Sequence, residues 1–237
     1  MNTTVKNPKL VKSMFASVAH KYDRANSVLS MGIHHLWRAK LVKLANFNIG
    51  QKVLDCATGT GDLAIAFKKA VGAQGEVIGT DFCEEMLSYA PQKAQAQGLE
   101  IQFEIADAMN LPFADSAFDG ASISFGIRNV EDPKKAISEM ARVVKSGGKV
   151  LVLEFGQVNI PIIGPLYNFY SQQILPKIGG WVTGDEHAYQ YLQKSSAQFP
   201  CRDSFVQLMK EAAPFKSVKY YSLSLGIAYI YIGVVQK

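Results

Sequence analysis

At 237 residues, the chain is long enough for one large α/β domain or two small ones. Hydrophobic residues make up 48% and charged residues 19%, a balance typical of a folded protein rather than a disordered one. The net charge of +5 is mild, spread along the chain without blocks of like charge, and indicates no nucleic-acid partner, although it suits an anionic membrane surface.

The first expected element is helical. Residues 14–44 have amphipathic helical spacing and end before the first apolar run. Short apolar runs then alternate with helical stretches in the order Lys52–Cys56 (strand), Asp62–Ala70 (helix), Glu76–Asp81 (strand), Glu84–Gln97 (helix), Glu100–Ile105 (strand), Phe118–Phe125 (strand), Asp132–Val144 (helix) and Lys149–Phe155 (strand). This alternation favours an α/β fold with a doubly wound, mostly parallel sheet and right-handed crossovers.

Residues 156–200 break the alternation with several prolines and many aromatic residues. We interpret them as an insertion over the carboxyl edge of the sheet. Their aromatic side chains are candidates for the wall of a long apolar tunnel, or for the core of a small subdomain. These side chains are Tyr167, Phe169, Tyr170, Trp181, Tyr189 and Tyr191.

The remaining segment is expected to complete the sheet. A helix near Asp203–Ala213 precedes two strands, Val218–Leu223 and Ala228–Val235, and their short link through Gly226 favours a final antiparallel hairpin. The sequence therefore predicts a single domain over residues 1–237, with a helical cover at 1–48 and the insertion at 156–200 on the substrate side.

A glycine-rich loop joins the first strand to the first helix. It reads Asp55-Cys-Ala-Thr-Gly59-Thr60-Gly61-Asp62, and its glycines let a ligand approach the free N–H groups of the helix start. Asp81 ends the second strand, where a carboxylate can accept both hydroxyls of a ribose, and Asp107 follows the third strand, near an expected adenine edge. These residues predict a nucleoside site at the switch point of the sheet. Asp81 would also suit a helix cap, and Asp107 would also suit a turn.

The loop chemistry distinguishes two cofactors that share this physics. Asp55 can pair with a cationic ligand group such as an ammonium, whereas it would repel a dinucleotide pyrophosphate. A short-chain oxidoreductase would also need Tyr-x-x-x-Lys beyond the fourth strand. That spacing occurs at Tyr89 and Lys93, on the helix after the second strand, where we expect two solvated side chains. The sequence therefore favours S-adenosyl-L-methionine over NAD.

Three longer motifs carry a family resemblance over essentially the whole chain. They are Phe15-Ala-Ser-Val-Ala-His-Lys-Tyr-Asp-Arg-Ala-Asn-Ser-Val-Leu-Ser-Met-Gly-Ile-His-His-Leu-Trp37, Ser124-Phe-Gly-Ile-Arg-Asn-Val130 and Arg142-Val-Val-Lys-Ser-Gly-Gly-Lys-Val-Leu-Val-Leu-Glu-Phe155. They resemble the signatures of the ubiquinone/menaquinone biosynthesis C-methyltransferases. Ala25, Ser146 and Gly156 depart from the usual residues, at positions where no cofactor contact is expected.

The resemblance implies a class I, Rossmann-like methyltransferase fold with a seven-stranded sheet. It implies transfer of a methyl group from S-adenosyl-L-methionine to a ring carbon of a polyprenylated quinol, either a demethylmenaquinol or a 2-methoxy-6-polyprenyl-1,4-benzoquinol. It also implies cofactor contacts at positions matching Thr60, Asp81, Asp107, Ala108 and Ser124.

Methylation of a quinol carbon calls for a group that stabilises the phenolate and for a base near the ring. Arg128 and Asn129, after the fourth strand, are the candidates for binding the quinol oxygen. Tyr22, Asp23 and His34 are the candidates for proton handling. Each has a structural alternative: Arg128 would pair with Glu131 or Asp132, and the other side chains would cap or pack the N-terminal helices.

Three alternatives remain open from the sequence: methylation of another small molecule at oxygen or nitrogen, a nucleic-acid methyltransferase, and a binding module that has lost catalysis. An Asn-Pro-Pro-Tyr motif and a basic stripe are missing from the sequence, which argues against nucleic acid. The cysteines have no metal spacing and no signal peptide is visible, so we expect no metal and a cytoplasmic protein, peripheral at the inner face of the membrane at most. A homo-oligomer is compatible with the sequence.

Overall fold

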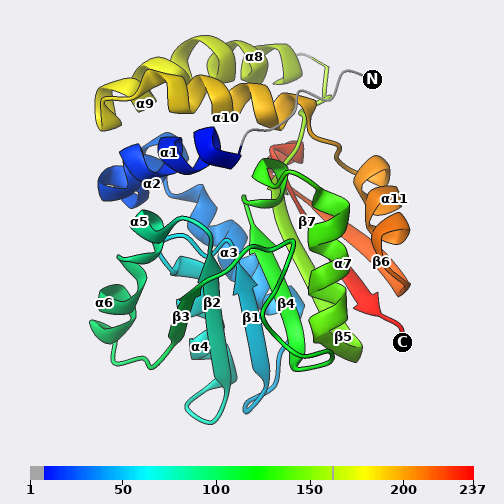
Figure 1. Cartoon of the computed structure of the whole chain (residues 1–237). Helices are drawn as coiled ribbons and strands as arrows, with labels where there is room; N and C mark the ends of the chain where they lie inside the picture. The colour runs from blue at the N-terminus through cyan, green and yellow to red at the C-terminus, as the bar shows by residue number, and fades with distance from the viewer. Residues whose placement is uncertain (1–7, 162) are drawn as a thin grey trace.

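The computed structural model describes residues 8–161 and 163–237. A seven-stranded sheet has the order β3-β2-β1-β4-β5-β7-β6 (Figure 1). Its strands are β1 (Lys52–Cys56), β2 (Glu76–Asp81), β3 (Gln102–Ile105), β4 (Phe118–Ser124), β5 (Val144–Phe155), β6 (Phe215–Leu223) and β7 (Ala228–Val235). Neighbours among β1 to β5 pair in parallel, and β7 runs antiparallel to both β5 and β6. The predicted mostly parallel sheet with a final antiparallel hairpin is confirmed.

Helices pack on both faces of the sheet and across one end of it (Figure 1). They are α1 (Pro8–Val18), α2 (Tyr22–Leu29), α3 (Ile33–Ala45), α4 (Asp62–Val71), α5 (Glu84–Leu87), α6 (Ala90–Gln95), α7 (Pro133–Val143), α8 (Ile163–Phe169), α9 (Leu175–Thr183), α10 (Glu186–Gln198) and α11 (Asp203–Ala212). None of the described helices is both long enough and apolar enough to cross a membrane.

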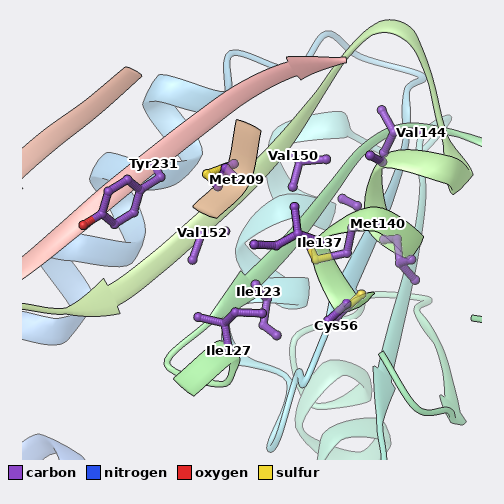
Figure 2. Close-up of a cluster of buried hydrophobic side chains, with 14 of the residues drawn as sticks. Cys56, Ile123, Ile127, Ile137, Met140, Val144, Val150, Val152, Met209 and Tyr231 are labelled. Carbon is purple, nitrogen blue, oxygen red and sulfur yellow. The ribbon is translucent and has the colours of Figure 1, made fainter. Parts of the chain in front are cut away.

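The alternation of side chains along β5 produces two apolar cores. Val150 and Val152 pack with residues of α7 and α11, as Figure 2 shows, while Leu151 and Leu153 pack with residues of α3 and α4 on the other face. Successive strand residues point to opposite faces, so one apolar run serves both cores. Each of these buried side chains contributes about 1.5–3 kcal/mol to folding.

Two predicted boundaries are wrong. The helix expected over 84–97 is two short helices, α5 and α6, because Pro91 lies in the first turn of α6 and provides no N–H to continue from α5. The strand expected from Lys149 begins at Val144, which pairs with Phe118 across a register shift, and Gly147 takes a φ of 80° within it. Helix α7, which precedes this strand, ends at Val143. Its N-cap residue is Asp132, whose carboxylate accepts hydrogen bonds from the backbone N–H groups of Lys134 and Lys135.

Helices α1, α2, α8, α9 and α10 form a layer at one end of the sheet, which we call the cap (Figure 1). The N-terminal part of the cap packs on α10 through an apolar cluster that includes Val18 and Tyr189. A second cluster joins Ala19 of the cap to Cys83 and Met86, just beyond β2. Two segments far apart in the sequence are thus joined to each other and to the sheet.

Candidate active site

Two cavities lie where the cap meets the carboxyl ends of the strands. The small cavity has a volume of about 260 Å³ and the large cavity a volume of about 360 Å³. Phe15, Tyr22 and Phe125 line both of them. These three rings therefore form the wall between the cavities.

The small cavity contains most of the predicted cofactor residues, namely Gly59, Asp81, Asp107, Ala108 and Ser124. Asp81 is nearly buried, and its two carboxylate oxygens accept the backbone N–H groups of Gly59 at 2.8 Å and of Cys83 at 2.9 Å. Burial raises the pKa of Asp81, and the backbone donors oppose this rise. The carboxylate is thus fixed at the rim of the loop.

The other predicted loop residues support the small cavity without lining it. Asp55 is buried, and its oxygens accept the hydroxyls of Ser122 at 2.6 Å and Thr58 at 2.7 Å, so it braces the loop against β4. Burial raises the pKa of Asp55 to about 6. Gly61 has a φ of 84°, and a Cβ there would lie 2.9 Å from Cβ of Ala90, so glycine is required. The hydroxyl of Thr60 points to the cap and donates to Asp23 at 2.6 Å.

The small cavity suits a cationic nucleoside. The acidic side chains Asp81, Asp107 and Glu131 line it, and no Lys, Arg or His does so among the described residues. Oγ of Ser124 and Oδ1 of Asn129, two buried atoms of lining residues, have no hydrogen-bond partner in the described part of the chain. Such an atom costs about 1–3 kcal/mol until a ligand satisfies it. The site therefore fits S-adenosyl-L-methionine, which carries a sulfonium and an ammonium, better than a pyrophosphate.

Arg128 lines the large cavity and is buried. Its Nη1 donates to Oε1 of Glu154 at 2.7 Å and to the carbonyl of Phe125 at 2.6 Å. The expected structural alternative, a pair with Glu131 or Asp132, is wrong, because the 3₁₀ turn at 127–129 and the end of β5 bring Arg128 and Glu154 together. Nε of Arg128 is buried without a partner among the described residues.

The walls of the large cavity are mostly apolar and aromatic. Of the aromatic residues predicted to form a tunnel, Tyr167, Tyr170, Tyr189 and Tyr191 line it. Phe169 and Trp181 do not, and they are 59% and 88% exposed. The hydroxyl of Tyr191 is buried without a partner in the described chain; burial raises the pKa of Tyr191, and nearby Arg128 opposes this rise. Arg128 and Tyr191 thus each bring an unpartnered polar atom to the lining of a mostly apolar cavity.

His34 also lines the large cavity, and its neighbours fix its tautomer. The hydroxyl of Ser30 donates its single proton to the carbonyl of Asn26 at 2.6 Å and lies 2.6 Å from Nδ1 of His34. Nδ1 must therefore be the donor to Ser30, which leaves Nε2 with the lone pair. Burial, with the charges of Arg38 and His35, lowers the pKa of His34 to about 4. The imidazole is accordingly neutral at physiological pH and can accept a proton.

We expect His34 to make folding stability depend on pH. An unfolded histidine takes up a proton near pH 6.5, whereas folded His34 does so only near pH 4, so its contribution to stability is lost as the pH falls from 6.5 to 4. Asp55 has the opposite effect on stability. Because its pKa is raised to about 6, folded Asp55 takes up a proton more readily than unfolded Asp55, so this residue adds stability as the pH falls below 6. The measurement is the melting temperature at pH 7 and pH 5, where His34→Gln should lose less stability than wild type. His20→Gln, at an exposed histidine, is the control, and equal losses in all three proteins would contradict the assignment.

The remaining predicted catalytic residues lie in different parts of the site. Tyr22 lies in the wall between the cavities, and Asn129 lines the small cavity rather than the large one. Asp23 lines neither of these cavities, and its oxygens accept from Thr60 and from Lys93. Lys93 is therefore not the solvated helix residue that its sequence position suggested. No sequence motif indicated that Lys93, Asp23 and Thr60 would meet.

One group of potential metal donors occurs in the described residues. His34, His35 and Asp62 bring donor atoms within 4.8 Å of one another. Both oxygens of Asp62 already interact with the cations of Arg38 and Lys93. Neither carboxylate oxygen of Asp62 is therefore free to bind a metal ion.

Comparisons with known proteins show the family to which the chain belongs. A family model described as the ubiE/COQ5 methyltransferase family matches residues 2–235. The chain is 64% identical over 230 residues to the ubiquinone/menaquinone biosynthesis C-methyltransferase UbiE of Bdellovibrio bacteriovorus, with 97% of each chain covered. It is 44% identical over 221 residues to the demethylmenaquinone methyltransferase of Thermus thermophilus, with 93% and 99% covered.

A solved structure supports the fold. It is a possible histamine N-methyltransferase from Thermotoga maritima, described as dependent on S-adenosyl-L-methionine, with a TM-score of 0.66. The match covers 94% of this chain and 98% of that one at 22% identity. A likeness at this identity concerns the fold alone.

Proposed function

The chain belongs to the ubiE/COQ5 methyltransferase family, and we propose that its large cavity holds a polyprenylated quinol during methylation. The protein is an S-adenosyl-L-methionine-dependent C-methyltransferase of quinone biosynthesis. One observation carries the proposal: the two cavities share a wall but differ in the charged side chains that line them. Acidic side chains line the small cavity, whereas Arg38, Arg128 and the neutral His34 line the large one, which has no acidic lining residue among those described.

This segregation of charge matches the reaction. S-adenosyl-L-methionine, when bound, supplies an electrophilic methyl group on a positively charged sulfur. The quinol becomes a carbon nucleophile as one of its hydroxyls ionises, and Arg128, through its unpartnered Nε, stabilises the resulting phenolate. A new C–C bond forms as the C–S bond breaks; the ring carbon then loses its proton and the quinol oxygen regains one, so that one proton is released for each methyl group transferred.

Three further residues complete the proposed chemistry. His34, neutral and with a free lone pair, accepts the ring proton. Tyr22, in the wall between the cavities, holds the ring against the methyl group. Asn129 orients the cofactor from the small cavity through its unpartnered Oδ1. The cap excludes water from both reactants.

The test uses purified protein with labelled S-adenosyl-L-methionine and two reduced acceptors with short prenyl tails, a demethylnaphthoquinol and a methoxybenzoquinol. We expect label on a ring carbon of at least one, and the ratio between them assigns the pathway. Cofactor binding by calorimetry without transfer to either acceptor would contradict the quinol proposal and favour another small-molecule acceptor.

The cap also provides a surface that suits a membrane. Lys177 is the only charged residue between Glu154 and Asp185, a segment that carries the exposed Phe169 and Trp181. Met31 is 82% exposed and lines the large cavity, so it marks the mouth of that cavity.

Positive charge is not spread evenly, contrary to expectation. Asp23 is the only acidic residue before Asp55, and it is paired with Lys93. The same stretch contains many basic residues: Lys6, Lys9, Lys12, Lys21, Arg24, Arg38, Lys40, Lys43 and Lys52. Of these, Lys9, Lys12 and Arg24 lie on the cap helices α1 and α2, and a layer that carries both basic and exposed apolar residues attracts an anionic leaflet. The proposed function therefore includes peripheral contact of the cap with an anionic membrane face, where the prenylated quinol is dissolved.

Tryptophan fluorescence reports this contact directly. The chain has two tryptophans, and Trp37 is buried whereas Trp181 is 88% exposed. We expect vesicles containing phosphatidylglycerol to shift the emission to the blue, and Trp181→Ser to lower vesicle affinity about tenfold, since a buried aromatic side chain contributes well over 1 kcal/mol. Tyr221→Ser, at an exposed aromatic of β6, is the control. An unchanged spectrum with anionic vesicles would refute membrane contact.

A further inference from the structure

A polar cluster crosses the boundary between the cap and the sheet. Asp23 of α2 accepts from the hydroxyl of Thr60 at 2.6 Å and from Nζ of Lys93 at 2.5 Å. Lys93, on α6, also contacts Asp62 at the start of α4 and Oγ1 of Thr60 at 3.3 Å. Arg38 of α3 holds the other oxygen of Asp62 at 2.6 Å. Four helices and the glycine-rich loop meet in this cluster.

The cluster is closed with respect to both hydrogen bonds and charge. Lys93 has three ammonium protons and three oxygen partners, and both oxygens of Asp23 are engaged. The two carboxylates of Asp23 and Asp62 balance the two cations of Lys93 and Arg38. Burial raises the pKa of Asp62, but Arg38 and Lys93 outweigh burial and leave the pKa below its ordinary value. The cluster is most complete when all of its members are charged and the cap is in place.

Two residues of the polar cluster are next in sequence to residues that line the two cavities. Asp23 follows Tyr22, which forms part of the wall between them. Thr60 lies between Gly59 and Gly61, and Gly59 lines the small cavity while donating its N–H to Asp81. A displacement of α2 would therefore break the contacts of Asp23 with the loop and move Tyr22 out of the wall.

We propose that Lys93 is a positioning residue, and that with Asp23 it forms a latch that holds the cap closed over the small cavity. The small cavity is lined by Gly59 of the loop and by Phe15 and Tyr22 of the N-terminal segment, so a cofactor held there would favour the latched state. By reciprocity, the latch strengthens cofactor binding. The proposal rests on the proposed function only for the identity of the cofactor.

The test compares Lys93→Met with wild type in the full chain. Calorimetric affinity for S-adenosyl-L-methionine should fall about tenfold, within the usual range of coupling between two sites. The rise in melting temperature at one fixed, saturating cofactor concentration should also shrink, because a tenfold loss of affinity removes about 1.4 kcal/mol of the stabilisation that the cofactor provides. Asp23→Asn, which keeps the shape of the side chain, should weaken binding similarly, and the double variant should be no weaker than either single variant.

Two comparisons separate a latch from a stabilising ion pair. Lys134→Met removes the exposed pair of Lys134 with Glu211, 2.6 Å apart between α7 and α11, and should leave cofactor affinity unchanged. Tryptic cleavage after Lys21 or Arg24 of the cap should slow on cofactor addition in wild type but not in Lys93→Met. Lys93→Arg, which retains the charge, should recover most of the affinity.

A Lys93→Met protein that melts lower but binds cofactor as wild type does would overturn the proposal. Additive losses in the double variant would overturn it as well. Because calorimetry needs no quinol, a latch effect without quinol methylation would contradict the proposed function and leave the latch standing.

Discussion

Replacing Arg128 with methionine should cost about 3–5 kcal/mol of folding free energy, because buried Glu154 loses its cationic partner. The same change should lower kcat at least about 100-fold, as expected for removal of a donor that stabilises an oxyanion. The first effect alone would not establish a role in catalysis. A variant that separates the two effects is therefore needed.

The double variant Arg128→Met with Glu154→Met provides that separation. It replaces the buried ion pair with apolar side chains of similar length, which is often neutral for stability. We expect its melting temperature to return toward wild type while kcat stays low. Arg142→Met, which removes an arginine bonded to Glu139 and Asp115 away from both cavities, should keep kcat. Wild-type kcat in the double variant would show that Arg128 acts only through stability.

Asp81→Asn should weaken binding of S-adenosyl-L-methionine about 100-fold, since each hydrogen bond to a charged group contributes about 1.5–3 kcal/mol. The carboxylate of Asp81 accepts one backbone hydrogen bond on each oxygen, from Gly59 and from Cys83. The asparagine amide has a single oxygen at this place and can keep only one of the two. The loss therefore combines fewer acceptors for the ribose with a loop that is held less firmly.

Calorimetry with S-adenosyl-L-methionine measures this effect. Glu76→Gln is the matched control, because Glu76 begins the same strand at its opposite end and pairs with Lys52 on the surface. Its affinity should equal that of wild type. An Asp81→Asn protein that binds within about threefold of wild type would exclude the predicted ribose contact.

The sequence determined the sheet and the small cavity because the signals for both are local. Apolar runs with flanking glycines predict strands wherever they occur, and in a parallel sheet the carboxyl ends of the strands must share one edge. Gly59, Asp81, Asp107 and Ser124 therefore had to converge once the strands were recognised. The division of the helix at Pro91 was missed, although its cause is local, since a proline cannot continue a helix from the preceding turn.

The family signatures likewise lie in continuous stretches of the chain, so the sequence was sufficient to indicate the reaction class and the cofactor. Their residues were correctly placed in the neighbourhood of the site. The individual contacts of these residues could not be predicted from the sequence. Asp23 accepts hydrogen bonds from Thr60 and Lys93, and Asn129 lines the small cavity.

Only the tertiary structure decided which side chains meet across the site. Arg128, in the turn after β4, pairs with Glu154 near the end of β5, and Lys93 joins Asp23 and Asp62 from separate helices. Phe169 and Trp181 face outward while neighbouring Tyr167 and Tyr170 face the large cavity. A helix pattern specifies that one face is buried, but the partner and the direction depend on how distant segments pack. The sequence alone thus defined the edge where chemistry takes place, and packing of the cap onto that edge divided it into a cavity lined by acidic side chains and a mostly apolar cavity that contains Arg128.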